Sequence, residues 1–293
     1  MALFSLGFAG CLHGDTRPPP AVVHLTVEPS AAVTEGFTTV DGWHVAFERF
    51  LISLGGARLD AFGLGGEDAD DSACKSYAGA GYERLFDLVV GSPQKLSDIY
   101  GLGSCGVRLR LRAPGSDALL GKGVKAQDLA FMRAPGTDEI VSNAPRTVHV
   151  RGLASRDATT IHFDWSFRLD LTLHGCRGAD GQGFTSDVVL IGGELVDLPV
   201  VIHGEALFRE GRTDESPLRF DALAAADADG DHAITLTELA AAPGPLPEVD
   251  AGKGPLDGGG PTMVQLIHEE LLPRMIRLRD SGACAADRPE NRQ

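Results

Sequence analysis

Most of the chain alternates between hydrophobic and polar residues with a period of two, the pattern of β-strands that bury one face. The alternation begins at residues 21–27, returns at 42–56 and at 107–112, and is longest at 161–174. In this last stretch every odd position is apolar and every even position is polar. We therefore expect a single strand of about fourteen residues there, with one face in a core and one in water.

Shorter strands are predicted at 84–90, 188–191 and 195–208. Residues 58–62 follow Gly55-Gly56 and are predicted to form a hairpin with the strand before these glycines. Gly and Pro separate the strands, and there is no repeated alternation of strand and helix. These patterns predict a mainly β fold, an antiparallel sandwich or barrel-like sheet, over residues 21–210.

Three stretches have helical patterns. Short helices are expected at 93–100 and 126–132, and a longer C-terminal helix is expected to pack on the β body over 262–284. Thr262 is its predicted N-cap, and Pro273 is expected to kink it. Its apolar stripe consists of Met263, Leu266, Ile267, Leu271, Met275 and Leu278. Residues 244–261 before it are rich in Gly, Pro and Asp and predict a flexible linker.

The composition narrows the function. With 293 residues, 43% of them hydrophobic, the chain can bury the core of one large domain or two modest ones. The formal net charge is −15. A nucleic-acid partner is therefore not expected, because phosphate binding requires a basic face. The acidic balance agrees with divalent cations as ligands, or with solubility alone.

Residues 227–238, Asp-Ala-Asp-Gly-Asp-His-Ala-Ile-Thr-Leu-Thr-Glu, resemble the twelve-residue calcium loop of an EF-hand. Calcium takes 6–8 oxygen ligands, and this spacing supplies them from alternate positions of one turn. The resemblance implies a Ca²⁺ site whose ligands are Asp227, Asp229, Asp231, the carbonyl of Ala233, Thr235 and Glu238. Ile234 fits the small strand that anchors such loops. The alternative is an Asp-rich surface turn.

The flanks of this loop fit an EF-hand-like segment at 213–243. Residues 218–226 predict an entering helix, and 236–241 predict an exiting helix that Pro243 ends early. Two positions depart from the family. His232 stands at position six, where glycine usually makes a sharp turn, and Ala226 stands where an aromatic residue is usual. His is among the residues enriched at positive φ, so the turn remains accessible.

The N-terminus resembles a bacterial lipoprotein signal peptide. An apolar run ends in Phe8-Ala9-Gly10-Cys11, which matches a lipobox except that Phe8 replaces the preferred Leu. The resemblance implies a signal peptide at 1–11, lipidation of Cys11, a tether at 12–20, and an exported protein held to the membrane by its lipid in the periplasm or outer membrane. An ordinary secretory signal or a buried N-terminal strand are the alternatives.

Four cysteines remain after Cys11: Cys74, Cys105, Cys176 and Cys284. An even number in an exported chain predicts two disulfides, with three connectivities open. We favour Cys74–Cys105, which closes a short loop, and Cys176–Cys284, which would attach the C-terminal helix to the body. The alternative is that all four are buried free thiols. Zinc binding is not expected, because the spacing of these cysteines is not typical of zinc sites.

No complete catalytic motif is present. Leu102-Gly103-Ser104-Cys105-Gly106 comes nearest to a nucleophile elbow but lacks its first glycine, so a Gly-rich turn is the preferred interpretation. His162 and His174 share a strand face but are separated by roughly 40 Å of strand, too far for one metal ion. His44 and His203 lie on predicted strands that could meet in space.

Two charged stretches have simple explanations. Arg108, Arg110 and Arg112 lie on one face of a predicted strand, which could meet an anion, although a solvated sheet face is preferred. Residues 65–72 form an acidic segment without the spacing that would converge its carboxylates on a cation.

The order of strands resembles that of the MbnP-like periplasmic copper-associated proteins. The segments that carry the resemblance are Phe50-Leu51-Ile52-Ser53, residues 82–88, residues 105–111 and Asp164-Trp165-Ser166-Phe167. That family implies a β-sandwich and metal handling, and no individual metal ligand can be carried over from it.

The sequence thus favours an exported calcium-binding lipoprotein in which calcium is structural. A periplasmic copper-binding protein and an enzyme with an unrecognised site are the alternatives.

Overall fold

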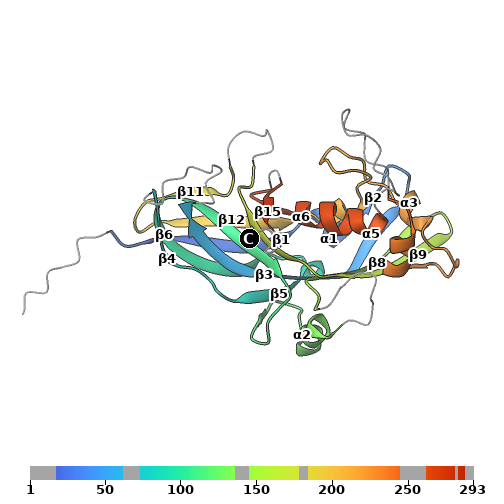
Figure 1. The fold of residues 1–293 in the computed structure, drawn as a ribbon, viewed down its shortest axis with the longest axis horizontal. Helices are drawn as coiled ribbons and strands as arrows, with labels where there is room; N and C mark the ends of the chain where they lie inside the picture. Colours follow the sequence, from blue (N-terminus) through green and yellow to red (C-terminus); the bar gives the residue numbers. More distant parts are fainter. Residues whose placement is uncertain are drawn as a thin grey trace, which may run out of the picture.

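The computed structural model describes residues 18–61, 73–135, 145–177, 184–244, 262–280 and 283–287. Within these ranges the strands join one continuous, curled sheet, and helices and turns gather toward one end of it (Figure 1). The mainly β prediction is therefore confirmed. The strands are β1 (Ala21–Pro29), β2 (Phe37–Thr38), β3 (His44–Asp60), β4 (Cys74–Ala78), β5 (Glu83–Asp87), β6 (Gln94–Arg112), β7 (Leu119–Leu120), β8 (Val148–Arg156), β9 (Thr159–Phe167), β10 (Asp170–His174), β11 (Asp187–Leu190), β12 (Leu195–Ile202), β13 (Ala233–Ile234), β14 (Ile276–Leu278) and β15 (Ala285–Asp287).

The main path through the sheet is β13-β9-β8-β3-β6-β1-β12-β14. Most neighbours are antiparallel, but β1–β12, β5–β7 and β9–β13 are parallel. The two long strands β3 and β6 carry the other strands: β6 pairs with β1, β3, β4, β10 and β11 along its length. The helical elements are α1 (Ala31–Glu35), η3 (Leu88–Val90), α2 (Ala126–Arg133), η4 (Gly204–Phe208), α3 (Asp221–Ala224), α4 (Leu236–Ala241), α5 (Met263–Gln265), η5 (Leu266–Leu271) and α6 (Leu272–Arg274).

The hairpin expected at Gly55-Gly56 does not form. β3 continues through both glycines to Asp60, and the register of its pairing with β6 shifts between Gly55 and Arg58. Gly56 has φ +55, so the glycines supply a β-bulge in place of a turn. Glycine pairs of this kind occur both in β-bulges and in hairpin turns. Which of the two forms depends on the strands that pair with the segment.

The helix expected at 93–100 is also wrong, because β6 begins at Gln94. Residues 94–101 pair with β1 in antiparallel register, and Leu96 and Ile99 are fully buried. The same strand runs straight through Ser104 and Cys105, so neither the elbow nor the Gly-rich turn considered there exists. Pairing with β1 thus overrides the local helical preference of this stretch.

The long strand expected at 161–174 is divided into β9 and β10, which pair with β8 and β6 respectively. Thr147 occupies the break: its hydroxyl donates to the carbonyl of Leu169 at 2.8 Å and accepts from the amide of Leu169 at 2.9 Å. The apolar period continues across the break, so the sequence pattern cannot reveal it.

The predicted C-terminal helix is shorter than 262–284. Thr262 caps it as expected, but the helix ends at Arg274 and residues 276–278 pair with β12 as β14. A π-helical turn, η5, precedes Pro273. Pro273 has no backbone N–H to donate within the helix, and π turns are one of the irregularities that helices adopt at such places. The helix and the β body share one hydrophobic core, which includes Ile267 and Trp165.

The two predicted disulfides are present. Cys74–Cys105 joins β4 to β6, and Cys176–Cys284 joins the end of β10 to the residue before β15. No described helix has the length and apolar character needed to cross a bilayer. The predicted signal peptide, Cys11, residues 12–17 of the tether, the acidic segment at 65–72 and residues 245–261 of the linker lie outside the described residues.

Candidate metal centre

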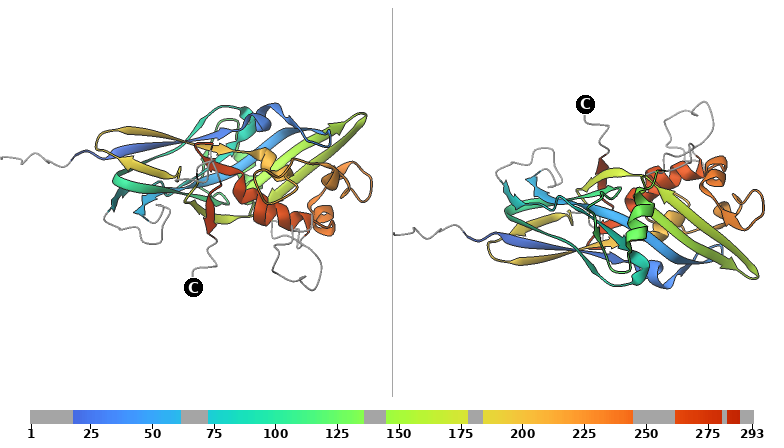
Figure 2. Two further views of the ribbon diagram at one scale, coloured as in Figure 1. Left: turned by 90° about the horizontal axis from the view of Figure 1, so that it is seen from above. Right: turned by 90° about the horizontal axis from the view of Figure 1, so that it is seen from below.

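The Asp-rich loop lies between α3 and α4, at the opposite end of the molecule from the start of β1 (Figure 2). The exiting helix α4 matches the predicted 236–241, whereas the entering helix is the single turn Asp221–Ala224 within the predicted 218–226. Phe220, Leu223, Leu236 and Leu239 are buried in the main core. The loop is therefore an exposed turn held at both ends by buried side chains.

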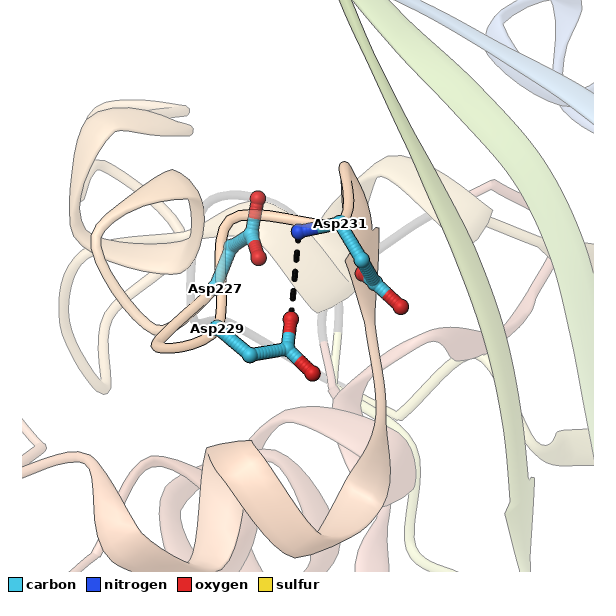
Figure 3. A group of neighbouring side chains, drawn as sticks. All are labelled: Asp227, Asp229 and Asp231. Atoms are coloured by element: carbon cyan, nitrogen blue, oxygen red, sulfur yellow. Dashed lines mark hydrogen bonds between the residues drawn. The ribbon is translucent and has the colours of Figure 1, made fainter.

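Three of the predicted ligands lie together. One carboxylate oxygen from each of Asp227, Asp229 and Asp231 lies within 4.8 Å of the others (Figure 3). Two oxygens on opposite sides of a calcium ion are about 4.6–5.2 Å apart, because each Ca–O distance is about 2.3–2.6 Å. In the described part of the chain this is the one group of three or more His, Cys, Asp or Glu side chains at metal-binding distances.

Backbone amides fix these carboxylates. Asp227 accepts from the amides of Gly230 at 2.9 Å and His232 at 3.1 Å. Asp229 accepts from the amide of Asp231 at 3.1 Å (Figure 3). Asp231 accepts from the amide of Ala233 at 2.7 Å. The bonds of Asp229 and Asp231 are Asx-turn bonds to the amide two residues on, whereas those of Asp227 reach three and five residues along the turn. Asp229 and Asp231 each use one carboxylate oxygen in these bonds, so their second oxygen is open to a cation.

The unusual residue at position six takes the backbone conformation that glycine normally provides. His232 has φ +64, as the family pattern predicts for this position, and Gly230 has φ +73. A non-glycine residue in this region costs about 1 kcal/mol. The side chain of His232 is 64% exposed, so it contributes no packing that would offset this cost.

The loop is attached to the sheet through β13. The amide of His162 donates to the carbonyl of His232 at 2.8 Å, and the indole of the buried Trp165 donates to the carbonyl of Ile234 at 2.8 Å. Successive carbonyls of an extended segment point in opposite directions. The carbonyl of Ala233, between these two, is therefore directed away from β9, as a ligand at position seven requires.

Glu238 lies outside the three-carboxylate group. Its carboxylate accepts from the amide of Ala228 at 3.1 Å and from the amide and hydroxyl of Thr235, both at 2.8 Å. Burial raises its pKa, but these hydrogen bonds outweigh burial and hold the pKa below its usual value. The carboxylate is thus ionised and tied to both ends of the loop, and Thr235 serves as the N-cap of α4.

The histidines form no comparable group among the described residues. His203 lies between two carboxylates: Nδ1 is 2.8 Å from Glu205 and Nε2 is 2.6 Å from Asp280. Burial lowers the pKa of His203, but the two carboxylates raise it above the ordinary value. A protonated imidazole donates from both nitrogens and offers no lone pair to a metal. This arrangement therefore does not support His203 as a copper ligand in its present contacts.

One cluster that sequence inspection missed has the residue types of a hydrolase. His149 Nδ1 lies 3.1 Å from the hydroxyl of Ser166 and 3.5 Å from Asp164. Both partners meet the same ring nitrogen, whereas a catalytic triad needs the serine and the carboxylate on opposite nitrogens. Burial lowers the pKa of His149. The alternation of β8 and β9 places these side chains on one face, but the cluster lacks triad geometry.

A second missed group is Asp187 on β11. Burial raises the pKa of Asp187 to about 6, although a hydrogen bond involving Ser186 lowers it. A carboxyl of this kind stays partly protonated near neutral pH.

Comparison with known proteins finds no matching family model, no matching curated protein and no matching solved structure.

Proposed function

We propose that this chain is an exported calcium-binding protein in which one Ca²⁺ ion stabilises the folded state. The observation that carries the proposal is the convergence of Asp227, Asp229 and Asp231 within 4.8 Å, at the spacing of a calcium loop. Three negative charges so close together repel one another, and a bound divalent cation removes that repulsion. Calcium, with its preference for carboxylate and carbonyl oxygens, fits this donor set.

The remaining ligands come from the second half of the loop. The carbonyl of Ala233 and the side chain of Thr235, acting through water, complete the expected positions. Glu238 contributes both oxygens after exchanging its bonds to Ala228 and Thr235 for the ion. Because those bonds already hold the carboxylate beside the loop, the movement required is a local one.

The attachment of the loop to the sheet favours a structural role over a sensor role. Sensor EF-hands open a pair of helices. Here α3 is one turn long, α4 ends before Pro243, and β13 is hydrogen-bonded to β9 where EF-hands use a second loop. Both flanks of the loop are buried in the main core. Calcium binding should therefore stabilise this end of the sheet without moving one helix relative to the other.

Export agrees with the cysteine chemistry, since disulfides persist in oxidising compartments. Anchoring to the bacterial membrane through a lipid on Cys11 is part of the same proposal. It rests on the lipobox alone.

A melting curve of the protein with calcium and with a chelator tests the proposal. At a calcium concentration 100 times the dissociation constant, binding adds about 2.7 kcal/mol to the free energy of unfolding. We expect Asp229→Asn and Glu238→Gln to lose most of this gain. Asp197→Asn, a change at an exposed carboxylate of β12, is the control and should retain it.

Two results would contradict the proposal. An unchanged melting temperature on adding calcium would show that the loop does not bind calcium to the folded state. A large calcium-dependent change in the radius measured by small-angle scattering would show that calcium drives a conformational switch and is not only structural.

A further inference from the structure

A cavity of about 490 Å³ lies over the face where β3 and β6 pair, away from the Asp-rich loop. Arg108, Arg110 and Arg112 project from alternate positions of β6, and Arg58 lies directly opposite Arg108 on β3. All four line the cavity. Like charges directly opposite each other in a sheet are destabilising, so this arrangement calls for a specific compensation.

Carboxylates outside the cavity lining form ion pairs with these arginines. Arg108 pairs with Asp60 at 2.9 Å, Arg110 with Asp170 at 3.1 Å, and Arg112 with Glu83. None of these three carboxylates belongs to the described residues that line the cavity, among which Asp287 is the one acid. The described lining therefore contains four arginines and one acid, while the carboxylates that pair with these arginines lie outside the lining. The chain as a whole has a formal net charge of −15.

Two of the arginines have hydrogen-bond donors to spare. Arg58 meets Asp60 through Nε at 3.4 Å, and its side chain is 50% exposed. Arg110 uses Nε and Nη2 in a fork on Asp170. A guanidinium carries five N–H groups, so among the described residues both terminal nitrogens of Arg58 and Nη1 of Arg110 are available. The planar fork of arginine matches carboxylate and phosphate oxygens.

The other walls of the cavity are small and fixed. Gly56, Gly79 and Gly81 line it, and a side chain added at Gly56 would meet Arg110 within 3.0 Å. Glycine at these positions keeps the space open. Thr172 on β10 and Asp287 on β15 close the opposite side, and the Cys176–Cys284 disulfide holds β15 against β10. The cavity is thus wide enough for a ligand larger than a single inorganic ion.

We propose that this cavity binds a small organic or inorganic oxyanion bearing two or more carboxylate or phosphate groups. Arg58 and Arg110 contact its oxygens, and Arg108 and Arg112 supply positive charge behind them. The hydroxyl of Thr172 can accept or donate one further hydrogen bond. The strands that form this site differ from those that hold the Asp-rich loop, so the inference does not depend on calcium binding.

Calorimetric titration of the full-length, calcium-free protein tests the proposal, in a low-salt chloride buffer with two separate probes. Inorganic pyrophosphate represents the phosphate class and tricarballylate represents the carboxylate class. We expect at least one probe to bind with a dissociation constant below about 1 mM. Arg58→Gln and Arg110→Gln should each weaken that binding about tenfold.

Arg151→Gln is the matched control. Arg151 meets Glu48 through Nε at 3.3 Å and is 53% exposed, closely like Arg58, but it lies on β8 outside the cavity. Its replacement removes the same charge and should change the affinity less than twofold. Arg58 is half exposed, so its variant is expected to fold, which melting curves of all three variants verify.

The preferred probe identifies the class of ligand. The proposal is overturned if neither probe binds more tightly than about 1 mM, or if Arg58→Gln and Arg151→Gln weaken binding equally, since an equal loss would reflect only the total charge.

Discussion

Two clusters of like charge occupy this molecule, and they are built in opposite ways. In the Asp-rich loop, three carboxylates come from five consecutive residues, and they accept hydrogen bonds from backbone amides of the same turn. On the arginine face, the guanidinium groups come from β3 and β6, and their carboxylate partners Asp60, Glu83 and Asp170 come from three different strands.

The two clusters differ in where the opposite charge that balances them comes from. The local turn brings its three acids together with a single imidazole, that of His232, 3.9 Å from Asp227. We propose that a cation from solution matches the remaining negative charge. A sheet face brings acids from neighbouring strands to the bases, so the fold itself compensates the arginines. Under the proposed calcium binding, the first cluster gains stability from the ion, whereas the second depends on its internal ion pairs.

The largest effect is expected from removing a buried ion pair of the arginine face, which should lower stability independently of calcium. Glu83 is 6% exposed and pairs with Arg112. Glu83→Gln removes the charge that a half-buried guanidinium needs, and we expect a loss of about 2 kcal/mol in the free energy of unfolding, measured by urea denaturation. Adding calcium should not restore this loss, because the pair lies outside the loop.

Asp170→Asn is the control for this prediction. Asp170 is 44% exposed and pairs with a similarly exposed Arg110. The expected loss is about 0.5 kcal/mol, since exposed ion pairs contribute little. Losses of equal size at Glu83 and Asp170 would show that burial does not decide the strength of the arginine-face pairs.

A smaller effect is expected where the loop meets the sheet. Trp165→Phe removes the indole that donates to the carbonyl of Ile234, a loss of about 1 kcal/mol from this hydrogen bond in addition to the packing change. We expect calcium binding to weaken as well, because the loop loses part of its anchor. Titration calorimetry and melting curves measure the two quantities separately.

The chain contains its own control for this change. Trp43, which is also buried, donates to the carboxylate of Asp221 at 2.9 Å, not to a carbonyl of the Asp-rich loop. Trp43→Phe should lower stability while leaving calcium affinity nearly unchanged. If both tryptophan variants bind calcium equally well, the attachment of β13 to β9 does not hold the loop in its binding conformation.

The smallest effect lies inside the loop. His232→Gly relieves the cost of φ +64 at position six, and we expect calcium affinity to tighten by a few-fold, about 0.5–1 kcal/mol. Calorimetric titration of both proteins measures it. Weaker binding by the glycine variant would mean that the imidazole, 3.9 Å from Asp227, contributes to the site.

Much of the architecture follows from local pattern. Alternation at 21–27 and at 107–112 lies within β1 and β6, and residues 236–241 form α4. The cysteine pairing is as favoured from the sequence. These predictions hold because each depends on neighbouring residues or on cysteine chemistry. The strands follow from the burial of one face, α4 ends early at Pro243, and the Cys74–Cys105 bond closes a short loop.

The failures share one cause. Residues 93–100 become strand because β1 offers a row of hydrogen-bonding groups, and the fourteen-residue pattern at 161–174 is divided because Thr147 bonds to Leu169 at the break. Gly55-Gly56 forms a bulge because β6 continues past it. In each case a partner distant in sequence decides between two local structures of similar energy.

The same division applies to the two charged clusters. The sequence by itself determined the Asp-rich turn, including the positive φ of His232, because Asp227, Asp229 and Asp231 and the amides that they accept from lie within five residues of one another. Only the tertiary structure decided that β13 attaches this turn to β9, and that Arg58 joins Arg110 beside a cavity. Strand register sets both, and register is fixed by burial of a whole sheet face, a property of many strands that no single segment contains.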